Sequence, residues 1–253
     1  MELPIIQVKN LVKKYNQFTA VDHISFDVYQ NEIFGLLGPN GAGKTTTLEI
    51  IETLCDKNEG EVIVDGMSID TQKQDIKKII GVQLQAAGYY PNLNLKELLE
   101  VFAGLYNIKI DPIQILDEVN LKDKAKNKFK ELSGGQKQRF SIATTLINKP
   151  KIIFLDEPTT GLDPQARRNL WDLIKKLKDN GTTIVITTHY MDEAEVLCDR
   201  IAIVDSGKII KLDTPDAMID HLIESGFERT KKVKAANLED VFLNLTGKAL
   251  RDF

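Results

Sequence analysis

Apolar and polar residues alternate along the first thirty positions of the chain. The stretches IIQVKNLVKKY and VDHISFDV share this period of two and are rich in β-branched residues, a pattern typical of strands with one buried face. The segment NQFTA between them indicates a turn. We therefore expect a small antiparallel β-sheet near the start of the chain.

A short apolar run then leads into a glycine-rich loop. EIFGLLG runs into GPNGAGKTT, and KTTTLEIIETL carries apolar residues at helical spacing. This order predicts a buried strand, a loop and a helix.

Helical spacing of apolar residues extends from about Leu95 to Ile147, with no convincing strand pattern.

Strand and helix patterns then alternate through KIIFLDE, ARRNLWDLIKKLKDN, TTIVITT, MDEAEVLC and RIAIVD. Such alternation predicts a mostly parallel sheet covered by helices. The expected fold is α/β, with an amino-terminal antiparallel β-subdomain and an inserted α-helical subdomain.

The glycine-rich loop carries the strongest chemical signal. Every fixed position of the P-loop pattern GxxxxGK[ST] is matched, by Gly38, Gly43, Lys44 and Thr45. Glycines let backbone N–H groups converge on phosphate oxygens, and the helix N-terminus adds partial positive charge. Lys44 is expected to reach the β and γ phosphates, and the Thr45 hydroxyl to ligate Mg²⁺. Three further loop residues complete the predicted nucleotide contacts: Asn40, Gly41 and Thr46.

The run IIFLDEP supplies the second half of the site. A buried strand there delivers Asp156 and Glu157 at its carboxyl end, where open α/β sheets bind ligands. Asp156 is expected to hold Mg²⁺ or its water, and Glu157 to orient or deprotonate the attacking water. A solvated strand end is the alternative, but the P-loop needs a metal partner. The predicted core is of the P-loop NTPase, RecA-like type.

Two other classes of P-loop protein fit less well. An acid suited to activating water favours an NTPase over a kinase. The segment NKPK, at residues 148–151, lacks the aspartate of the guanine-reading NKxD pattern, so nothing supports specificity for GTP.

A second phosphate-gripping loop, LSGGQ, lies at residues 132–136 at the start of a predicted helix. Ser133, Gly134 and Gly135 offer a hydroxyl and exposed N–H groups to an anion, and Gln136 is assigned to the same site. One γ-phosphate rarely needs both loops from the same side.

Composition limits the kinds of partner and the cellular compartment that we expect for this chain. Lys and Arg total 33 against 37 Asp and Glu, a formal net charge of -4, so no basic excess points to nucleic acid and none is expected as a partner. Two distant cysteines, Cys55 and Cys198, fit a reducing cytosolic compartment. The amino-terminal residues do not resemble a secretory signal, and no apolar run approaches the ~20 residues of a spanning helix. Any work at a membrane would require another chain to span it.

The order GPNGAGKTT, LSGGQ, IIFLDEP and TTGLDP resembles that of the ATP-binding-cassette (ABC) ATPases, from Lys9 to about Pro215. The resemblance implies an ATP- and Mg²⁺-dependent ATPase that forms a head-to-tail dimer. LSGGQ of one subunit then closes on the nucleotide held by the P-loop of the other. The resemblance also implies a nucleotide-binding domain over 1–215, with a helical subdomain at about 86–147, and a short C-terminal extension over 216–253.

Further residues match family positions. Tyr15 matches the aromatic on which adenine stacks, although an ordinary strand aromatic is a serious alternative. His189 follows TTIVITT and matches the histidine that hydrogen-bonds the γ-phosphate, whereas a lone histidine is usually a surface or satisfied core residue.

Two matches concern Mg²⁺ and the dimer. Gln85 matches the glutamine that touches Mg²⁺ and water and links the core to the helical lobe, with Gln83 as its near rival. Asp163 matches the residue that communicates across the dimer, and Asp before Pro164 is also a good helix cap. One departure from the family is the run Ala143, Thr144, Thr145, where an Ala-Arg-Ala run is frequent.

Within the family, YPNLNLKELL and GLDPQARRNLW most resemble subunits of ABC-2 type exporters, which pair with a separately encoded permease. The resemblance places the chain at the cytoplasmic face of the cell membrane, with residues 89–98 as the candidate permease-facing surface. Three alternatives stay open: the ATPase of an importer, a soluble cassette ATPase working on ribosomes or DNA, and a binding module with a dead site. The residues name no transported substrate.

Overall fold

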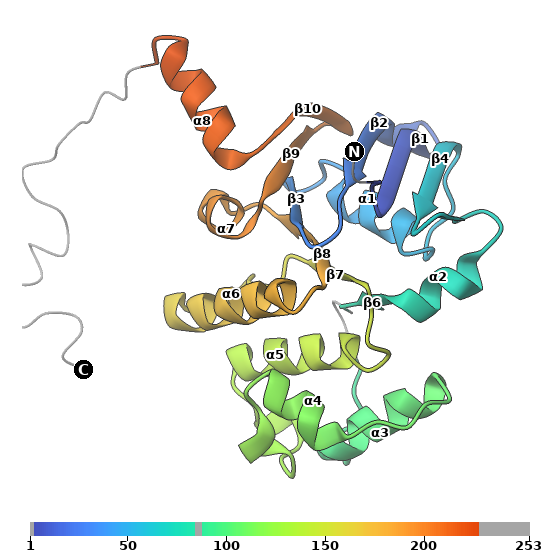
Figure 1. The fold of residues 1–253 in the computed structure, drawn as a ribbon, viewed down its shortest axis with the longest axis vertical. Coiled ribbons are helices and arrows are strands. Elements are labelled where there is room, and N and C mark those ends of the chain that lie inside the picture. Colours follow the sequence, from blue (N-terminus) through green and yellow to red (C-terminus); the bar gives the residue numbers. More distant parts are fainter. Residues whose placement is uncertain (1–2, 84–87, 228–253) are drawn as a thin grey trace, which may run out of the picture. The chain divides into compact units, whose positions relative to one another are not determined.

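The computed structural model describes residues 3–83 and 88–227 of the chain. The chain divides into two compact units, Met1–Ala217 and Met218–Phe253. The larger unit contains two β-sheets and a group of helices (Figure 1). Helix α8, Pro215–Glu224, crosses the boundary between the units. The domain limits expected from the sequence, 1–215 and 216–253, stay a prediction.

The first sheet is the expected antiparallel one. It is formed by β1 (Ile6–Tyr15), β2 (Phe18–Val28), β4 (Glu59–Val64) and β5 (Met67–Ser68) in the order β2-β1-β4-β5. Asn16 turns the β1–β2 hairpin with a φ of 54°, a left-handed conformation that asparagine tolerates. The alternating pattern of β1 and β2 thus predicted this hairpin, whereas β4 and β5 were not anticipated.

The second sheet has the order β10-β9-β3-β8-β7-β6, with all neighbours parallel except β10, which is antiparallel to β9. Its strands are β3 (Ile33–Leu37), β6 (Ile80–Val82), β7 (Ile152–Asp156), β8 (Thr183–Thr188), β9 (Arg200–Asp205) and β10 (Lys208–Asp213). Every residue of β3, β7 and β8 is buried, as their continuous apolar runs predict. The carboxyl ends of these three neighbouring strands therefore share one edge of the sheet.

The two sheets share a hydrophobic core. Phe26 of β2 and Phe34 of β3 stack with ring centroids 5.1 Å apart. Helix α1 (Lys44–Ile51) adds Leu48, Ile50 and Ile51 to the same core. The helix that follows the glycine-rich loop is therefore held by both sheets.

A group of helices lies between β6 and β7 in the chain, and Figure 1 shows it gathered away from the first sheet. It contains α3 (Leu95–Leu105), α4 (Pro112–Glu118) and α5 (Gly134–Thr145), with 3-10 turns at Lys122–Lys124 and Phe129–Glu131. Its core includes an aromatic cluster of Tyr89, Phe102, Phe129 and Phe140. These helices agree with the inserted helical subdomain, although the beginning of its expected range, 86–147, lies outside the described residues.

Three further helices connect strands of the second sheet or lead into it. Helix α2 (Lys73–Ile79) directly precedes β6, α6 (Pro164–Asp179) lies between β7 and β8, and α7 (Met191–Leu197) lies between β8 and β9. Helix α6 buries Leu170, Leu173, Ile174 and Leu177 along one face, which is the stripe expected of a helix that covers a sheet. In residues 3–83 and 88–227, no helix combines the length and apolar character needed to cross a bilayer.

Candidate nucleotide-binding and catalytic site

The glycine-rich loop joins the end of β3 to the start of α1. Gly41 and Gly43 have φ values of 81° and 98°, in the left-handed region that disfavours residues with a Cβ. Space is a second requirement at Gly43, because a Cβ there would lie 2.3 Å from the carbonyl oxygen of Ala20. Glycine therefore fixes the path of the loop through both its dihedral freedom and its small size.

The N-terminus of α1 is suited to an anion. Gly43 occupies the N-cap position, no side chain of the described residues caps this end, and the first turn contains no acidic residue. The first N–H groups of a helix have no intrahelical acceptor, and the helix end carries partial positive charge. A phosphate group would satisfy both the donors and the charge.

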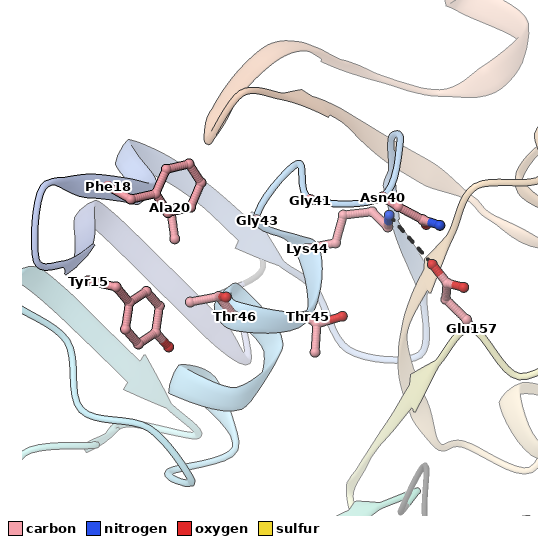
Figure 2. Close-up of a pocket in the computed structure, with 10 residues that line it drawn as sticks. All are labelled: Tyr15, Phe18, Ala20, Asn40, Gly41, Gly43, Lys44, Thr45, Thr46 and Glu157. Carbon is pink, nitrogen blue, oxygen red and sulfur yellow. Dashed lines mark ion pairs between the residues drawn. The ribbon is translucent and has the colours of Figure 1, made fainter.

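Lys44 adds a full positive charge beside these donors. Its side chain is 3% exposed, and Nζ donates hydrogen bonds to the carbonyl oxygens of Gly38 at 2.8 Å and Pro39 at 3.0 Å. The ammonium also lies 3.6 Å from Glu157 Oε1 (Figure 2). These three contacts keep the Lys44 ammonium close to the glycine-rich loop.

A cavity of about 450 Å³ opens beside the loop. Figure 2 shows Tyr15 and Phe18 on one side of the loop and Glu157 on the other. The lining residues are Tyr15, Phe18, Ala20, Asn40, Gly41, Gly43, Lys44, Thr45, Thr46 and Glu157. The structure therefore brings most of the predicted P-loop residues, Tyr15 and Glu157 to one cavity.

Phe18 and Ala20 are cavity residues that the sequence did not single out. Phe18 is 61% exposed and Tyr15 is 45% exposed, and both lie where the β1–β2 hairpin turns. An aromatic residue in the predicted turn NQFTA was the available signal for Phe18. Tyr15 packs further against its surroundings through its hydroxyl, which lies 3.5 Å from Sγ of Cys55.

Asp156 ends β7 and faces the P-loop helix. Its carboxylate accepts a hydrogen bond from the Thr45 hydroxyl at 3.1 Å and another from the hydroxyl of Thr187 in β8. Hydroxyl and carboxylate oxygens are the ligands that Mg²⁺ prefers, usually together with substrate phosphates and water. In the described part of the chain, no group of three or more His, Cys, Asp or Glu could hold a metal on its own. The pair thus fits a metal that the nucleotide helps to bind.

Glu157 has an unusual backbone for a residue with a side chain. Its φ is 47°, and its N–H donates to both the carbonyl and the hydroxyl oxygen of Thr187 at 3.1 Å. Its Oε2 accepts a hydrogen bond of 3.3 Å from the Thr160 hydroxyl. Left-handed conformations of this kind cost energy and persist where the surroundings hold them, often at functional sites. The strained turn directs the carboxylate toward Lys44.

His189 directly follows the last residue of β8. Its Nδ1 lies 3.1 Å from Glu157 Oε2, within ion-pair distance but out of hydrogen-bonding alignment. The ring also packs against Tyr190, with centroids 4.1 Å apart. The structure thus places His189 beside Glu157, a residue 32 positions away that is predicted to act in the same reaction.

The LSGGQ residues lie elsewhere. Ser133 is the N-cap of α5, where its hydroxyl accepts from the Gln136 N–H at 3.4 Å and the Gln136 side chain accepts from the Ser133 N–H at 3.0 Å. Gly134 and Gly135 form the first turn of this helix. None of the four lines the cavity beside Lys44. A single copy of the described chain does not bring the two loops together.

Comparison with known proteins identifies the family. Residues 21–160, more than half of the chain, match the family described as ABC transporter. The chain belongs to the ABC transporter family. Its relatives are ATP-binding subunits, and the fold and sequence make this chain an ATP-binding ABC ATPase.

Two relatives illustrate the similarity within the family. The chain is 36% identical over 244 residues to the linearmycin resistance ATP-binding protein LnrL of Bacillus subtilis, covering 94% of this chain and 78% of that protein. It is 34% identical over 304 residues to the Nod factor export ATP-binding protein I of Burkholderia orbicola, covering 100% of both chains. Both alignments run over nearly all of the present chain.

Solved structures of ABC cassettes share the fold. A dimeric structure of the ATP-binding cassette MJ0796 in a post-hydrolysis state bound to ADP and Pi has a TM-score of 0.74 and 29% identity, covering 83% of this chain and 98% of that chain. A structure of an ATP-binding subunit of an ABC transporter has a TM-score of 0.75 and 26% identity, covering 96% and 99%. The expected P-loop NTPase fold is thus confirmed.

Gln85, one of the residues predicted from the ABC family, lies outside the described residues. Its rival Gln83 is buried, its N–H donates to the Phe154 carbonyl at 3.0 Å, and its Oε1 has no hydrogen-bond partner in the described chain. Gln83 also shares a cavity of about 180 Å³ with Thr45 and Asp156. Gln83 thus lies close to Thr45 and Asp156, the predicted metal ligands of this ABC ATPase.

Asp163 occupies the position that helix-capping chemistry predicts. Its carboxylate accepts a hydrogen bond of 2.8 Å from the Ala166 N–H, and Pro164 is the first residue of α6. Its capping role is therefore observed, whereas its contact across an ABC dimer stays a prediction.

Proposed function

We propose that this chain is the ATP-hydrolysing subunit of an ABC exporter and that it drives a separately encoded membrane permease. The observation that carries the chemistry is the convergence of Lys44, Asp156, Glu157 and His189 at the carboxyl ends of β3, β7 and β8. Ligands of open α/β sheets bind at this edge. Intact residues at all four positions argue against a binding module with a dead site.

ATP would lie with its phosphates on the P-loop and its adenine between the loop and the β1–β2 hairpin. The N–H groups at the start of α1 and the Lys44 ammonium would bind phosphate oxygens. Tyr15 and Phe18 offer exposed rings on the adenine side, and either ring would stack on a base.

Thr45 and Asp156 would hold Mg²⁺, together with Gln85. Bound there, the ion would neutralise charge that develops on the phosphate oxygens. The existing Thr45–Asp156 hydrogen bond keeps the two oxygen ligands adjacent.

Glu157 would act on the attacking water. Its N–H donates to two oxygens of Thr187, which fixes the backbone and gives the carboxylate a defined starting position. His189 would bind the γ-phosphate and, through its contact with Oε2, keep the base oriented toward that group. The two side chains would therefore act together on the bond to the γ-phosphate that the attacking water breaks.

A head-to-tail dimer would complete the site. Because Ser133, Gly134, Gly135 and Gln136 do not line the cavity of their own chain, they are available to the nucleotide of a second copy. Asp163 lies at the start of α6 and would contact the partner. The dimeric ADP- and Pi-bound cassette to which this chain is similar supports such an assembly.

The direction of transport is inferred from relatives. The printed names of similar proteins concern linearmycin resistance, Nod factor export and, in Escherichia coli, a probable multidrug transporter that is 41% identical over 217 residues. An importer ATPase would use the same catalytic residues, so it is the competing function. A ribosome- or DNA-directed ATPase is less consistent with the net charge of -4.

The permease would bind on the side of α3. Tyr90, in the expected permease-facing stretch, is 64% exposed, and a cavity of about 300 Å³ lined in part by Phe102 of α3 also includes Leu54 and Tyr106. Exposed apolar groups of this kind favour a protein interface. The subunit would work at the cytoplasmic face of the membrane.

The test is to isolate the working complex. Tagged Glu157→Gln protein is purified from its native cells with ATP after gentle membrane solubilisation, and co-purifying proteins are identified by mass spectrometry. Lys44→Ala protein, treated identically, is the control for contacts that do not need bound ATP. We expect a polytopic permease whose recovery is greater with Glu157→Gln. Ribosomal or DNA-repair proteins without a permease would overturn the proposal.

A further inference from the structure

Helix α7 carries a buried carboxyl group close to the catalytic segment. Glu193 is four residues after His189 and is fully buried. Its Oε1 accepts a hydrogen bond of 3.1 Å from the indole Nε1 of Trp171 in α6. Carboxyl groups are rarely buried without partners, because removing them from water is costly. The Trp171–Glu193 contact is therefore a specific link between α6 and α7.

The same carboxyl group lies near one threonine at the end of β8 and another in the loop after β7. Burial raises the pKa of Glu193, and the hydroxyls of Thr188 and Thr159 partly oppose this effect. Thr188 ends β8 and directly precedes His189, whereas Thr159 lies two residues after Glu157. Glu193 thus lies where the loop after β7, the end of β8 and α6 meet.

Polar groups around this point are incompletely paired. The Thr159 hydroxyl is near enough to affect the pKa of Glu193, but neither it nor Glu193 Oε2 has a partner in hydrogen-bonding alignment among the described residues. Arg167 Nε is buried without such a partner as well. Most buried polar groups in proteins are paired, so a cluster of unpaired ones calls for an explanation. Because these groups make no aligned hydrogen bonds, they do little to hold α7 against α6, and the Trp171–Glu193 hydrogen bond matters more for the position of α7.

A second link joins the same helices nearer the surface. Arg167 Nη1 lies 3.1 Å from Asp192 Oδ2, and its guanidinium lies 4.6 Å from the centroid of the Tyr190 ring, which packs on His189. Asp192 is 58% exposed at its side chain, and exposed ion pairs contribute little. The Trp171–Glu193 hydrogen bond, whose acceptor is fully buried, is therefore the better anchor for this segment.

We propose that Glu193 is a positioning residue for ATP hydrolysis: by accepting the Trp171 indole N–H, it fixes α7 and the adjoining His189 segment against α6. His189 then stays beside Glu157 at the carboxyl edge of the sheet. The inference rests on the proposed roles of His189 and Glu157. Because Asp163 is the N-cap of α6, this helix also connects the His189 segment to the predicted dimer contact.

Three substitutions separate positioning from simple packing. Glu193→Gln keeps an Oε1 acceptor in nearly the same shape, Glu193→Leu removes the acceptor, and Trp171→Phe removes the donor. Glu195→Leu, at an exposed position of the same helix, is the matched control. Folding of each variant is checked by thermal unfolding.

The expected result is a separation of kcat from KM. Glu193→Leu and Trp171→Phe should each lower kcat for ATP between about tenfold and hundredfold, as a misplaced catalytic group does. KM for ATP should stay within about twofold, because the P-loop contacts are unchanged. Glu193→Gln should recover most of the lost turnover, and Glu195→Leu should match the wild type.

Trp171 also reports on the contact itself, because it is the only tryptophan of the chain. Glu193→Leu is expected to shift its fluorescence emission, and Glu195→Leu is not. Unchanged emission in Glu193→Leu would overturn the proposed contact between Trp171 and Glu193. Unchanged kcat in folded Glu193→Leu and Trp171→Phe, with an active wild type, would overturn the inference alone. An inactive wild type would overturn the proposed function as well.

Discussion

Nδ1 of His189 lies 3.1 Å from Oε2 of Glu157, although the two residues come from different strands. Strands β7 and β8 are parallel neighbours with Asp156 opposite Thr187, so the residues that follow them emerge side by side. On the other side, Lys44 approaches the second oxygen of the same carboxylate. Glu157 is therefore placed between a P-loop cation and an imidazole.

Replacement of Glu157 by Gln should separate binding from turnover. The amide keeps the shape of the side chain but does not accept a proton from water, so hydrolysis should fall on the order of 10²–10⁴-fold. ATP binding, measured by equilibrium dialysis, should be retained. Glu195→Gln, an exposed change of the same kind, is the control. Normal hydrolysis by Glu157→Gln would remove this residue from the mechanism.

Two complementary variants test the composite site. Ser133→Arg should bind ATP but hydrolyse it poorly, because the bulky cation blocks closure by the second copy. Lys44→Ala should bind ATP weakly. Mixing them should restore activity, since one of the two sites then has both an intact P-loop and an intact LSGGQ. Full activity of Ser133→Arg alone would contradict a role in trans.

Gly43→Ala should destabilise the fold more than a glycine change without crowding. Both Gly43 and Gly66 have positive φ, 98° and 75°, but a Cβ meets the Ala20 carbonyl at Gly43 and nothing within 4 Å at Gly66. Gly66→Ala should cost about 1–2 kcal/mol for the left-handed backbone alone. Chemical denaturation should give a larger loss for Gly43→Ala. Equal losses would mean that the crowding is relieved by a shift of the hairpin.

Removal of Mg²⁺ should abolish hydrolysis. A chelator is expected to stop turnover, and added Mg²⁺ to restore it. Asp156→Asn weakens the only carboxylate that is hydrogen bonded to Thr45 in the described chain. The Mg²⁺ concentration for half-maximal activity should then rise by about tenfold or more. An unchanged Mg²⁺ requirement in that variant would exclude Asp156 as a ligand.

Stability should fall as pH rises toward 8 because of Glu52. Burial raises the pKa of this carboxyl group from 4.5 to about 8, and the charges of Asp156 and Glu49 act in the same direction. The folded chain therefore keeps a proton that the unfolded chain loses above its own pKa, so the free energy of unfolding decreases between these two values.

Glu52→Gln removes this dependence. At pH 8 the variant should be more stable than the wild type, by as much as a few kcal/mol. Thermal unfolding at pH 5 and pH 8 measures the difference. Glu61→Gln, which changes an exposed carboxylate, should leave the pH dependence of the wild type in place. A parallel pH dependence in Glu52→Gln would contradict the assignment.

Local sequence determined the parts of the protein whose physics is local. Nine consecutive residues, GPNGAGKTT, contain the backbone freedom, the charge and the hydroxyl of a phosphate loop, so the loop was predictable without its surroundings. Continuous apolar runs likewise predicted β3, β7 and β8, because both faces of these strands are buried. Strand β5 has two residues and carries too little periodic signal to be predicted.

Tertiary structure decided which distant residues meet. Pairing of β1 with β2 brings Phe18 to the cavity, and the parallel register of β7 and β8 places the Thr187 hydroxyl on Asp156. The separation of Ser133 from the cavity and the bond between Trp171 and Glu193 also depend on how helices pack on the sheet. Periodicity reports which face of an element is buried, but it carries no information on what that face contacts. Local residue patterns therefore predict the chemistry of the nucleotide loops, whereas long-range packing selects the side chains that position this chemistry.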